Sequence, residues 1–274
     1  MKQQKSAFHP AVRSPHSARG VKVLSIAGSD PSSGAGIQVD LRTFQSLGVY
    51  GMALPAALTA QNSKGVSAVE AVRTPFFSKQ LETLLSDIRP DAVKTGMLLS
   101  KGNVDALALA VKKYAIGNLV IDPVIRSSSG RMLLLPAAVE SLKKKLFPLA
   151  LIVTPNIPEA EALTGRKISS ESDMDYAAGI LLDQGPSYVL IKGGHGKGPA
   201  TDTLYGGKTV LAFSTARRKG EFHGTGCVFS SAIAACIARG LPVEKAVEKA
   251  KQFVDKMLKT AQPVVKGRTK YFQF

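Results

Sequence analysis

Short apolar runs that alternate with longer amphipathic stretches constrain the fold of this chain more than any other feature of its sequence. The apolar runs are too short for helices and are rich in Val and Ile, as buried parallel strands tend to be. Five of them are expected to form the core of a sheet, at residues 21–26, 91–95, 118–122, 149–154 and 188–192.

The segments between these runs have the apolar spacing of helices that cover a sheet. Helices are expected at residues 36–47, 77–88, 103–114, 136–146, 157–163 and 172–184, and further on at 225–239 and 243–261. A helix of small residues is also expected to begin near Met52, and a β-hairpin is expected at 202–205 and 209–213. Alternating helices and buried strands imply a doubly wound sheet covered on both faces.

No internal repeat and no linker interrupts this pattern, so residues 21–274 are expected to form a single domain. Residues 1–20 carry Lys and Arg but no acid and no continuous apolar core, which argues against a secretory signal and favours a disordered basic tail. No apolar run reaches the roughly 18 to 20 residues that span a bilayer, so a membrane protein is not expected.

The composition narrows the partners of the chain. Its formal net charge of +16 would suit a nucleic-acid binder, but the basic residues are scattered and no aromatic residues interleave with them. No specific nucleic-acid partner is therefore expected. The only cysteines, Cys227 and Cys236, lie nine positions apart in one expected helix, beyond disulfide reach. Free thiols suit a reducing cytoplasm.

In a doubly wound sheet, ligands bind beyond the carboxyl ends of the strands. The first strand is followed by a loop rich in Gly and Ser, residues 28–36, which leads into a helix and can bring backbone N–H groups close to a ligand. The loop lacks the endings of a P-loop and of a dinucleotide fingerprint. A ligand-binding loop and a structural turn both stay open for it.

The segment His223-Gly224-Thr225-Gly226-Cys227 precedes a helix of small residues. Its two glycines would leave backbone N–H groups bare at a helix N-terminus, where an anion is favoured. The positive end of the helix is expected to lower the pKa of the Cys227 thiol, which would then act as a base or polarise a substrate hydroxyl. The alternative is a small buried side chain, which is the interpretation for Cys236.

Groups at the ends of other strands suggest a site for a metal and phosphates. Asp122 ends one strand and Asn156 and Glu159 begin the helix after the next, a set of hard ligands that suits Mg²⁺. For Glu159, a carboxylate that only complements the helix dipole is the alternative. A phosphate contact is expected at the strand end with Lys192 and Gly193, and the Gln61 amide is suited to reading the edge of a heteroaromatic ring.

In this order, these segments resemble the ribokinase-like superfamily, and closely its hydroxymethylpyrimidine and phosphomethylpyrimidine kinases of thiamine biosynthesis. The resemblance rests on residues 26–41, 43–44, 48–51, 57–62, 94–97, 122–124, 154–159, 192–195 and 223–227. It implies a ribokinase-like three-layer α/β/α sandwich with a mostly parallel central sheet. It also implies transfer of the γ-phosphate of ATP, with Mg²⁺, to 4-amino-5-hydroxymethyl-2-methylpyrimidine and then to its monophosphate. A homodimer, common among relatives of this fold, stays open.

The resemblance also implies roles for individual residues. The pyrimidine pocket would be lined by Gly28, Asp40, Gln61 and Met97. Asp122 and Glu159 would bind the metal, and the groups facing ATP would be Asn156, Lys192 and Gly193. Gly224, Thr225 and Gly226 would form the anion hole, and Cys227 stands where simpler relatives carry a catalytic Asp.

One departure from the family pattern concerns the loop after the Asp-Pro-Val strand. Many relatives carry a Lys where this chain has Ser128, so either Arg126 or Arg131 reaches the phosphates instead, or the second phosphorylation is weaker. Two other functions stay open. One is a pyridoxal kinase built on the same Gly-Thr-Gly-Cys loop, and the other is a catalytically inactive pyrimidine-binding regulator.

Overall fold

The computed structural model describes residues 20–193, 198–207, 209–264 and 269–274. The predicted tail, apart from Gly20, lies outside the described residues, as do Gly194 and His195 of the predicted phosphate-binding strand end and Lys208 of the predicted hairpin turn. The strands of the main sheet are β1 (Lys22–Ser29), β2 (Tyr50–Asn62), β3 (Gly65–Ala71), β4 (Ala92–Thr95), β5 (Leu119–Ile121), β6 (Ile152–Val153), β7 (Tyr188–Lys192), β8 (Ala200–Gly206) and β9 (Thr209–Thr215).

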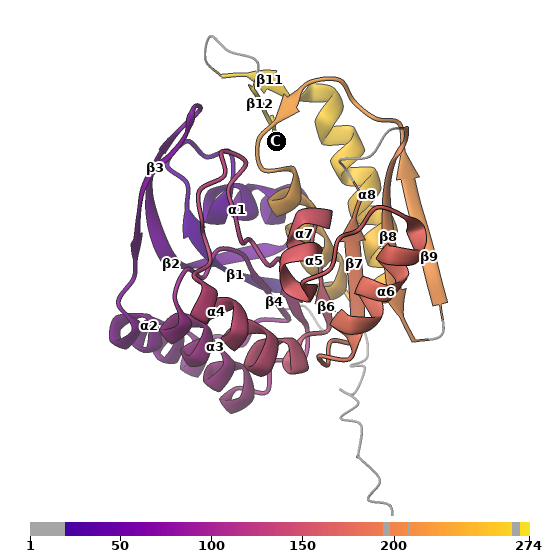
Figure 1. Ribbon diagram of the computed structural model, residues 1–274. Coiled ribbons are helices and arrows are strands. Elements are labelled where there is room, and N and C mark those ends of the chain that lie inside the picture. The colour runs from indigo at the N-terminus through magenta and orange to yellow at the C-terminus, as the bar shows by residue number, and fades with distance from the viewer. Residues whose placement is uncertain (1–19, 194–197, 208, 265–268) are drawn as a thin grey trace, which may run out of the picture.

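The sheet is parallel in its centre and antiparallel at both edges. Its strand order is β3-β2-β1-β4-β5-β6-β7-β8-β9, which Figure 1 shows from β3 at the left to β9 at the right. Pairing is parallel from β2 through β1 and β4 to β7, whereas β3 pairs antiparallel with β2, and β8 with both β7 and β9. All five predicted core strands and the predicted hairpin are present in this sheet.

Helices cover both faces of the sheet. They are α1 (Gly36–Ser46), α2 (Thr74–Asp87), α3 (Lys101–Lys113), α4 (Pro136–Ser141), α5 (Ile157–Thr164), α6 (Glu171–Leu182), α7 (Thr225–Ala238) and α8 (Val243–Thr260). A π-helical turn, Leu142–Leu146, and a 3₁₀ turn, Phe147–Leu149, continue α4. One apolar core joins the sheet to α2–α6, and a second joins it to α1, α7 and α8.

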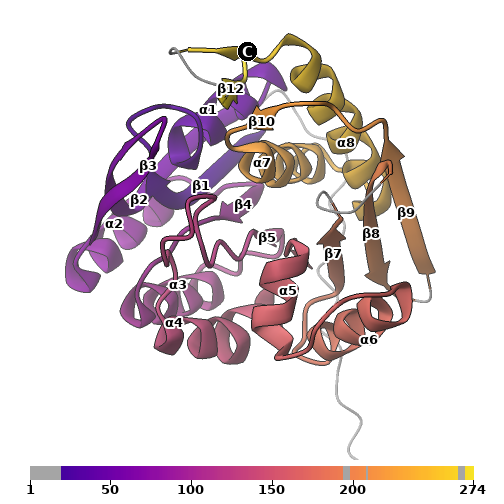
Figure 2. The ribbon, with the colours of Figure 1, turned by 45° about the horizontal axis from the view of Figure 1, so that its top comes forward.

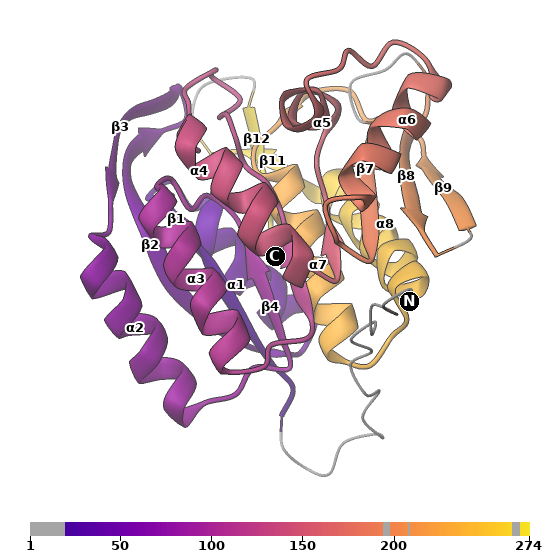
Figure 3. The same cartoon turned by 60° about the horizontal axis from the view of Figure 1, so that its bottom comes forward.

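The two helical layers are visible from two directions. In Figure 2, α7 and α8 lie side by side on one face of the sheet with α1 next to α7. In Figure 3, α2, α3 and α4 run alongside one another on the opposite face. This arrangement confirms the predicted three-layer α/β/α sandwich. No helix within the described ranges is long and apolar enough to cross a membrane.

The segment from Met52 to Gln61 forms strand β2, so the prediction of a helix there is wrong. Its run of Ala and Leu favours a helix by intrinsic propensity, but pairing with β1 from Tyr50 to Leu58 prevails over that preference. Met52, Leu54 and Ala56 alternate with less buried neighbours, which is the period of a strand. Pro55 is tolerated because β3 pairs with β2 only from Ala57 onward.

A small second sheet lies at the chain's C-terminal end. It consists of β10 (Glu221–Phe222), β12 (Thr269–Tyr271) and β11 (Gln262–Pro263), in the order β10-β12-β11. The backbone N–H of His223 donates to the Lys270 carbonyl, which extends the pairing of β10 with β12. The segment that leads into α7 is thus tied to the C-terminal strand.

Candidate active site

Three charged side chains toward the carboxyl ends of the parallel strands β4, β5 and β7 face α7. Lys94 lies in β4, Asp122 follows β5 and Lys192 ends β7. Successive side chains of a strand point to opposite faces, so Val93 belongs to the core under α2–α6 while Lys94 points the other way. Ser230 of α7 donates to Asp122 Oδ2 at 3.1 Å. The strand register therefore brings these charges together under α7.

Asp122 and Lys192 form a nearly buried ion pair. Lys192 Nζ lies 2.8 Å from Asp122 Oδ1, with side-chain exposures of 12% and 2%. Burial alone would raise the pKa of Asp122, but the ammonium groups of Lys192 and Lys94 hold it below its ordinary value. Asp122 is therefore a carboxylate at neutral pH.

The residues Asn156 and Glu159 form a capping box at the start of α5. Glu159 N–H donates to Asn156 Oδ1 at 2.8 Å, and Asn156 N–H donates to Glu159 Oε2 at 2.9 Å. Burial raises the pKa of Glu159 to about 7; Lys192 opposes this rise and the neighbouring Asp122 adds to it. The predicted metal ligands Asp122 and Glu159 therefore lie within electrostatic reach of each other and share Lys192 as a cation.

The N-terminus of α7 opens directly above this pair. Gly224 is the N-cap residue in the left-handed region at φ +79°, and a Cβ there would collide with the Gly34 carbonyl oxygen. Among the described residues no side chain caps α7, and its first turn holds no acid. A Cβ on Gly226 would stand 3.3 Å from Lys192 Nζ and 3.8 Å from Asp122 Oδ2. Bare N–H groups and a buried ammonium thus converge on one space.

The expected lowering of the Cys227 pKa is wrong. Burial raises the pKa of the Cys227 thiol to about 11, and Asp40 and Asp122 add to the rise. Lys94 and a hydrogen bond from the Gly36 backbone N–H oppose this rise without reversing it. The thiol is consequently protonated at neutral pH, although the residue keeps part of its surface exposed.

The loop at residues 28–36 packs against the α7 entry. Asp30 orders it by accepting from Ser32 N–H at 2.9 Å, from the Ser32 hydroxyl at 2.7 Å and from Ala35 N–H at 2.9 Å. Gly28 lies against Met97, since a Cβ on Gly28 would collide with Met97 Cε. Two of the predicted pyrimidine-binding residues are therefore in contact.

Asp40, the third of the predicted pyrimidine-binding residues, has no exposed surface. Both of its carboxylate oxygens accept from Lys94 Nζ, at 3.0 and 2.8 Å. The hydroxyls of Ser25 and Ser231 also donate to it. The structure thus places Asp40 in a buried polar network that joins β1, β4, α1 and α7, beneath the glycine loops.

Gln61, the fourth of these residues, lies at the far end of β2 beside His223. Its Nε2 is 3.1 Å from His223 Nε2, and the same ring nitrogen is 2.9 Å from Asp30 Oδ2. The sequence alone assigns no role to His223 of the glycine motif or to Asp30 of the loop. The two residues are 193 positions apart in the chain, so no local sequence pattern predicts their contact.

Two further residues that sequence reasoning missed support the strand end at Gly193. The Gly193 N–H donates to Asp202 Oδ1 at 3.1 Å, and Lys251 Nζ lies 2.6 Å from Asp202 Oδ2. A buried charge pair thus holds the backbone beside Lys192. A lysine on the buried face of a helix, as Lys251 is in α8, was the available signal.

The loop that contains Ser128 is held by its own arginines. Arg126 Nη1 donates to the Gly130 carbonyl at 3.2 Å, and Arg131 Nη1 donates to the Ser67 carbonyl of β3 at 2.7 Å. Ser127 and Ser129 hydroxyls lie 2.8 Å apart in the same loop. In this conformation both guanidinium groups bind backbone oxygens.

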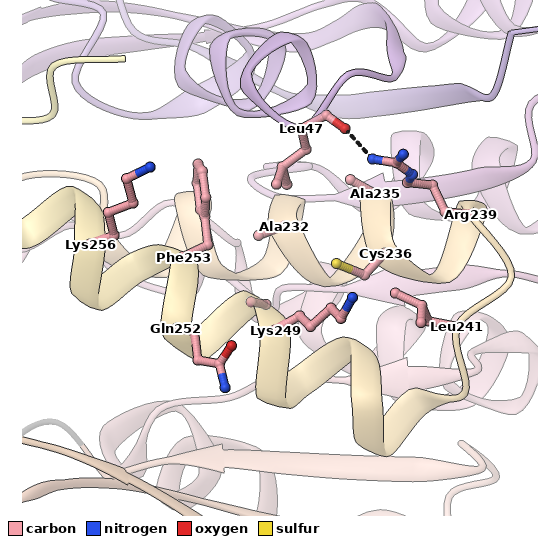
Figure 4. A pocket seen from close by; sticks show the side chains of 11 residues that line it. Leu47, Ala232, Ala235, Cys236, Arg239, Leu241, Lys249, Gln252, Phe253 and Lys256 are labelled. Carbon is pink, nitrogen blue, oxygen red and sulfur yellow. Dashed lines mark hydrogen bonds between the residues drawn. The ribbon is translucent and has the colours of Figure 1, made fainter.

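A groove of about 610 Å³ lies elsewhere, between the C-terminal end of α1, α7 and α8 (Figure 4). Phe253, Leu47 and the basic side chains of Arg239, Lys249 and Lys256 line it. Cys236, predicted as core, is only 7% exposed and contributes to its wall. The residues that line the groove include none of the predicted site residues, so it is separate from the site under the α7 N-terminus.

Comparison with known proteins gives consistent matches. A family model described as phosphomethylpyrimidine kinase matches residues 30–271. The thiamine biosynthesis bifunctional protein ThiED of Geobacter sulfurreducens is 45% identical over 247 residues. The match covers 89% of this chain and 50% of the length of ThiED. The hydroxymethylpyrimidine/phosphomethylpyrimidine kinase of Rhizobium meliloti is 43% identical over 248 residues, covering 89% of this chain and 93% of the relative.

Solved structures agree with these matches. A crystal structure of phosphomethylpyrimidine kinase from Clostridium difficile has a TM-score of 0.77 and 44% identity, covering 86% of this chain and 98% of that one. The pyridoxal kinase of Staphylococcus aureus in complex with AMP-PCP and pyridoxal has a TM-score of 0.84 and 36% identity, covering 93% of each chain. Both structures share the fold described above.

Proposed function

Because the chain belongs to the phosphomethylpyrimidine kinase family, we propose that it phosphorylates 4-amino-5-hydroxymethyl-2-methylpyrimidine and then the resulting monophosphate, using ATP. The kinase implied by the motifs is confirmed by the family match. In each step the bond from the γ-phosphorus to the β–γ bridging oxygen of ATP breaks and a bond to the acceptor oxygen forms. ADP leaves. In the first step the acceptor hydroxyl releases its proton to solvent, whereas in the second step the acceptor oxygen of the monophosphate is already ionised near neutral pH.

The observation that carries this proposal is the closeness of Gly226 to the Asp122–Lys192 pair. Phosphoryl transfer needs in-line positioning and neutralisation of spreading negative charge more than covalent chemistry. The N–H groups at Thr225 and Gly226 and the Lys192 ammonium supply fixed positive groups on one side of the transferred phosphoryl. Use of ATP is further supported by the relative that was solved with the analogue AMP-PCP.

The carboxylates of Asp122 and Glu159 fit Mg²⁺. Two buried carboxylates repel each other, and the raised pKa of Glu159 expresses that repulsion together with burial. A divalent cation held by these carboxylates would relieve the repulsion, and oxygen donors are the ligands that Mg²⁺ prefers. When bound, the ion would neutralise charge on the triphosphate. Asn156 fixes Glu159 through the capping box and would hold its carboxylate in place.

We assign Cys227 the role of orienting the substrate hydroxyl. A thiol with a pKa of about 11 is not ionised at neutral pH and is a weak general base. The transition state of phosphoryl transfer is loose, so the nucleophile needs little activation before the γ-phosphorus is in reach. Positioning of the hydroxyl beside the anion hole is then the larger contribution of this residue.

Pyridoxal kinase activity is the second candidate function. It is supported by the likeness to the pyridoxal kinase of Staphylococcus aureus, whose structure contains pyridoxal. An inactive regulator is disfavoured because the charged pair, the capped carboxylate and the glycines of the anion hole are all present. The substrate side of the site, at Gly28, Gln61 and Met97, must then distinguish the two rings.

Phosphorus NMR of the purified chain with ATP and each alcohol tests the proposal. We expect signals of the pyrimidine monophosphate and then of its diphosphate, with ADP formed in proportion. Turnover of pyridoxal alone would refute the pyrimidine assignment. Accumulation of the monophosphate would show that the second phosphorylation is slow, as expected if Ser128 weakens that step.

We further propose a cytoplasmic enzyme with no specific nucleic-acid partner. Sedimentation would distinguish a monomer from a homodimer.

A further inference from the structure

His223 is clamped between two polar partners and a ring. Its Nε2 lies 2.9 Å from Asp30 Oδ2 and 3.1 Å from Gln61 Nε2. The Tyr271 ring meets it edge-on, with centroids 5.5 Å apart and planes at 73°. A Cβ on Gly34 would collide with His223 Cδ2, so the imidazole lies directly against that backbone. The ring is therefore held in one orientation, with a side-chain exposure of only 18%.

The contact with Asp30 determines which ring nitrogen of His223 carries the hydrogen. Burial would raise the pKa of Asp30, but hydrogen bonds from His223 and Ser32 keep it below its ordinary value. An ionised carboxylate can only accept hydrogen bonds. The ring nitrogen that faces it must therefore be a donor, so the hydrogen lies on His223 Nε2.

This assignment determines how the Gln61 carboxamide is turned. An Nε2–H group cannot accept from the Gln61 amide, so the end of the carboxamide 3.1 Å from the ring nitrogen must be its oxygen, with the amide turned over. The single Nε2 hydrogen is then shared between Asp30 Oδ2 and this oxygen in a three-centre bond. The amide nitrogen then faces Thr59, whose Oγ1 is 3.3 Å from the other end of the carboxamide. The Thr59 hydroxyl gives its hydrogen to the Ser29 carbonyl at 2.8 Å, so its oxygen is available as an acceptor. The hydrogen bonds thus form a series that runs from the Ser29 carbonyl through Thr59, Gln61 and His223 to Asp30, and every donor in it has an acceptor.

We infer that His223 is a positioning residue that fixes the polarity of the Gln61 carboxamide and thereby selects the substrate ring. With one N–H used by Thr59 and one lone pair used by His223, Gln61 keeps one N–H donor and one carbonyl lone pair for a ligand. The complementary ring edge has an acceptor next to a donor. A ring nitrogen beside an exocyclic amino group offers that pair, and the ring nitrogen of pyridoxal, whose neighbouring ring carbons carry a methyl group and a hydrogen, does not.

Nitrogen NMR tests the hydrogen assignment without any substrate. In a long-range ¹H–¹⁵N spectrum of the free chain at pH 8, the His223 signals are identified as those lost in His223→Gln. We expect the pattern of a ring protonated on Nε2. A ring protonated on Nδ1 with a bare Nε2 would overturn the inference, because Gln61 would then donate to the ring.

Kinetics test the consequence for selectivity, which rests on the proposed function. His223→Leu removes the donor, and we expect the ratio of kcat/KM for the aminopyrimidine over pyridoxal to fall by about tenfold or more, mainly through KM. His223→Gln, whose amide N–H reaches a similar position, should restore most of that ratio. The KM for ATP should stay unchanged in both variants.

A matched variant separates positioning from a looser hairpin. Ser67→Ala removes a 2.7 Å hydrogen bond to the carbonyl of Ala60, the neighbour of Gln61 in β2, and leaves the Gln61 polarity intact. We expect its substrate ratio to equal that of the parent chain. An equal loss in Ser67→Ala and His223→Leu, or no loss in His223→Leu, would refute the inference while pyrimidine turnover persists. If the parent chain phosphorylates neither alcohol, the proposed function fails and the NMR result still decides the assignment.

Discussion

The ammonium of Lys192 lies 2.8 Å from Asp122 Oδ1, directly beneath the position that a side chain on Gly226 would occupy. The pair joins the carboxyl ends of β5 and β7 to the N-terminus of α7. It therefore fixes where positive charge is available beside the helix, and Gly226 keeps this space open.

Gly226→Ala is expected to reduce kcat about a hundredfold or more, because a methyl group would intrude 3.3 Å from Lys192 Nζ where the phosphoryl group must lie. The thermal midpoint should change little, since alanine suits a helix. Steady-state kinetics measure kcat, and calorimetry measures the thermal midpoint. Gly179→Ala in α6 is the control: nothing lies within 4 Å of its Cβ, and we expect a stability gain of about 0.5 to 1 kcal/mol with unchanged kinetics.

Substitution of Cys227 distinguishes orientation from base catalysis. We expect Cys227→Ala to lose turnover by orders of magnitude while pyrimidine binding, measured by calorimetry, persists. Cys227→Ser should keep at least about tenfold more activity than Cys227→Ala, because its hydroxyl preserves a hydrogen bond although it is a far weaker acid. Equal activity of the two variants would contradict an orienting role, and unchanged turnover in Cys227→Ala would remove any catalytic role.

Alkylation of Cys227 should be slow at neutral pH. With a pKa of about 11, only about one thiol in a thousand is ionised at pH 8, and the thiolate is the nucleophile. The rate with iodoacetamide should rise about tenfold per pH unit between pH 7 and 10. Peptide mass spectrometry reports the rate at this residue separately from Cys236. Rapid modification at pH 7 would be inconsistent with the raised pKa.

Stability should fall as the pH rises from about 4.5 to about 7, through Glu159. Its folded pKa, about 7, lies above the ordinary 4.5, so the folded chain binds the proton that the unfolded chain has already released. The contribution is fully present below the unfolded pKa and is lost as the pH approaches the folded pKa. Glu159→Gln keeps an acceptor for Asn156 N–H and should flatten this slope in urea unfolding curves. An unchanged slope would assign the dependence to other groups.

Lys94→Met is expected to destabilise the chain by about 3 to 5 kcal/mol, because it leaves the Asp40 carboxylate buried without its cation. Both side chains have no exposed surface. The double substitution Lys94→Met with Asp40→Asn should recover much of the loss, since the unpaired charge is then absent. Lys245→Ala, which breaks an exposed pair with Glu248, should cost about 0.5 kcal/mol or less in the same denaturation assay.

The sequence predicted most of the architecture because buried strands and amphipathic helices have periods that local residues display. It failed at β2, where the Ala and Leu residues around Met52 prefer a helix and only pairing with β1 decides otherwise. It did place Asp122 and Lys192 at the carboxyl ends of strands and Gly226 at the start of a helix, and these positions are sufficient to predict a single site. It could not foresee the Cys227 pKa, which depends on burial and on carboxylates contributed by distant segments.

The contact between Gly224 and the Gly34 carbonyl has a consequence for engineering this enzyme. The loop that leads from β1 and the loop that begins α7 leave no room for a side chain between them, so neither backbone can shift alone. A transplant that imports the ring-facing loop of a relative to change the accepted vitamin precursor must import the α7 entry with it. Recombination boundaries placed between residues 36 and 223 would separate halves that fit only as a pair.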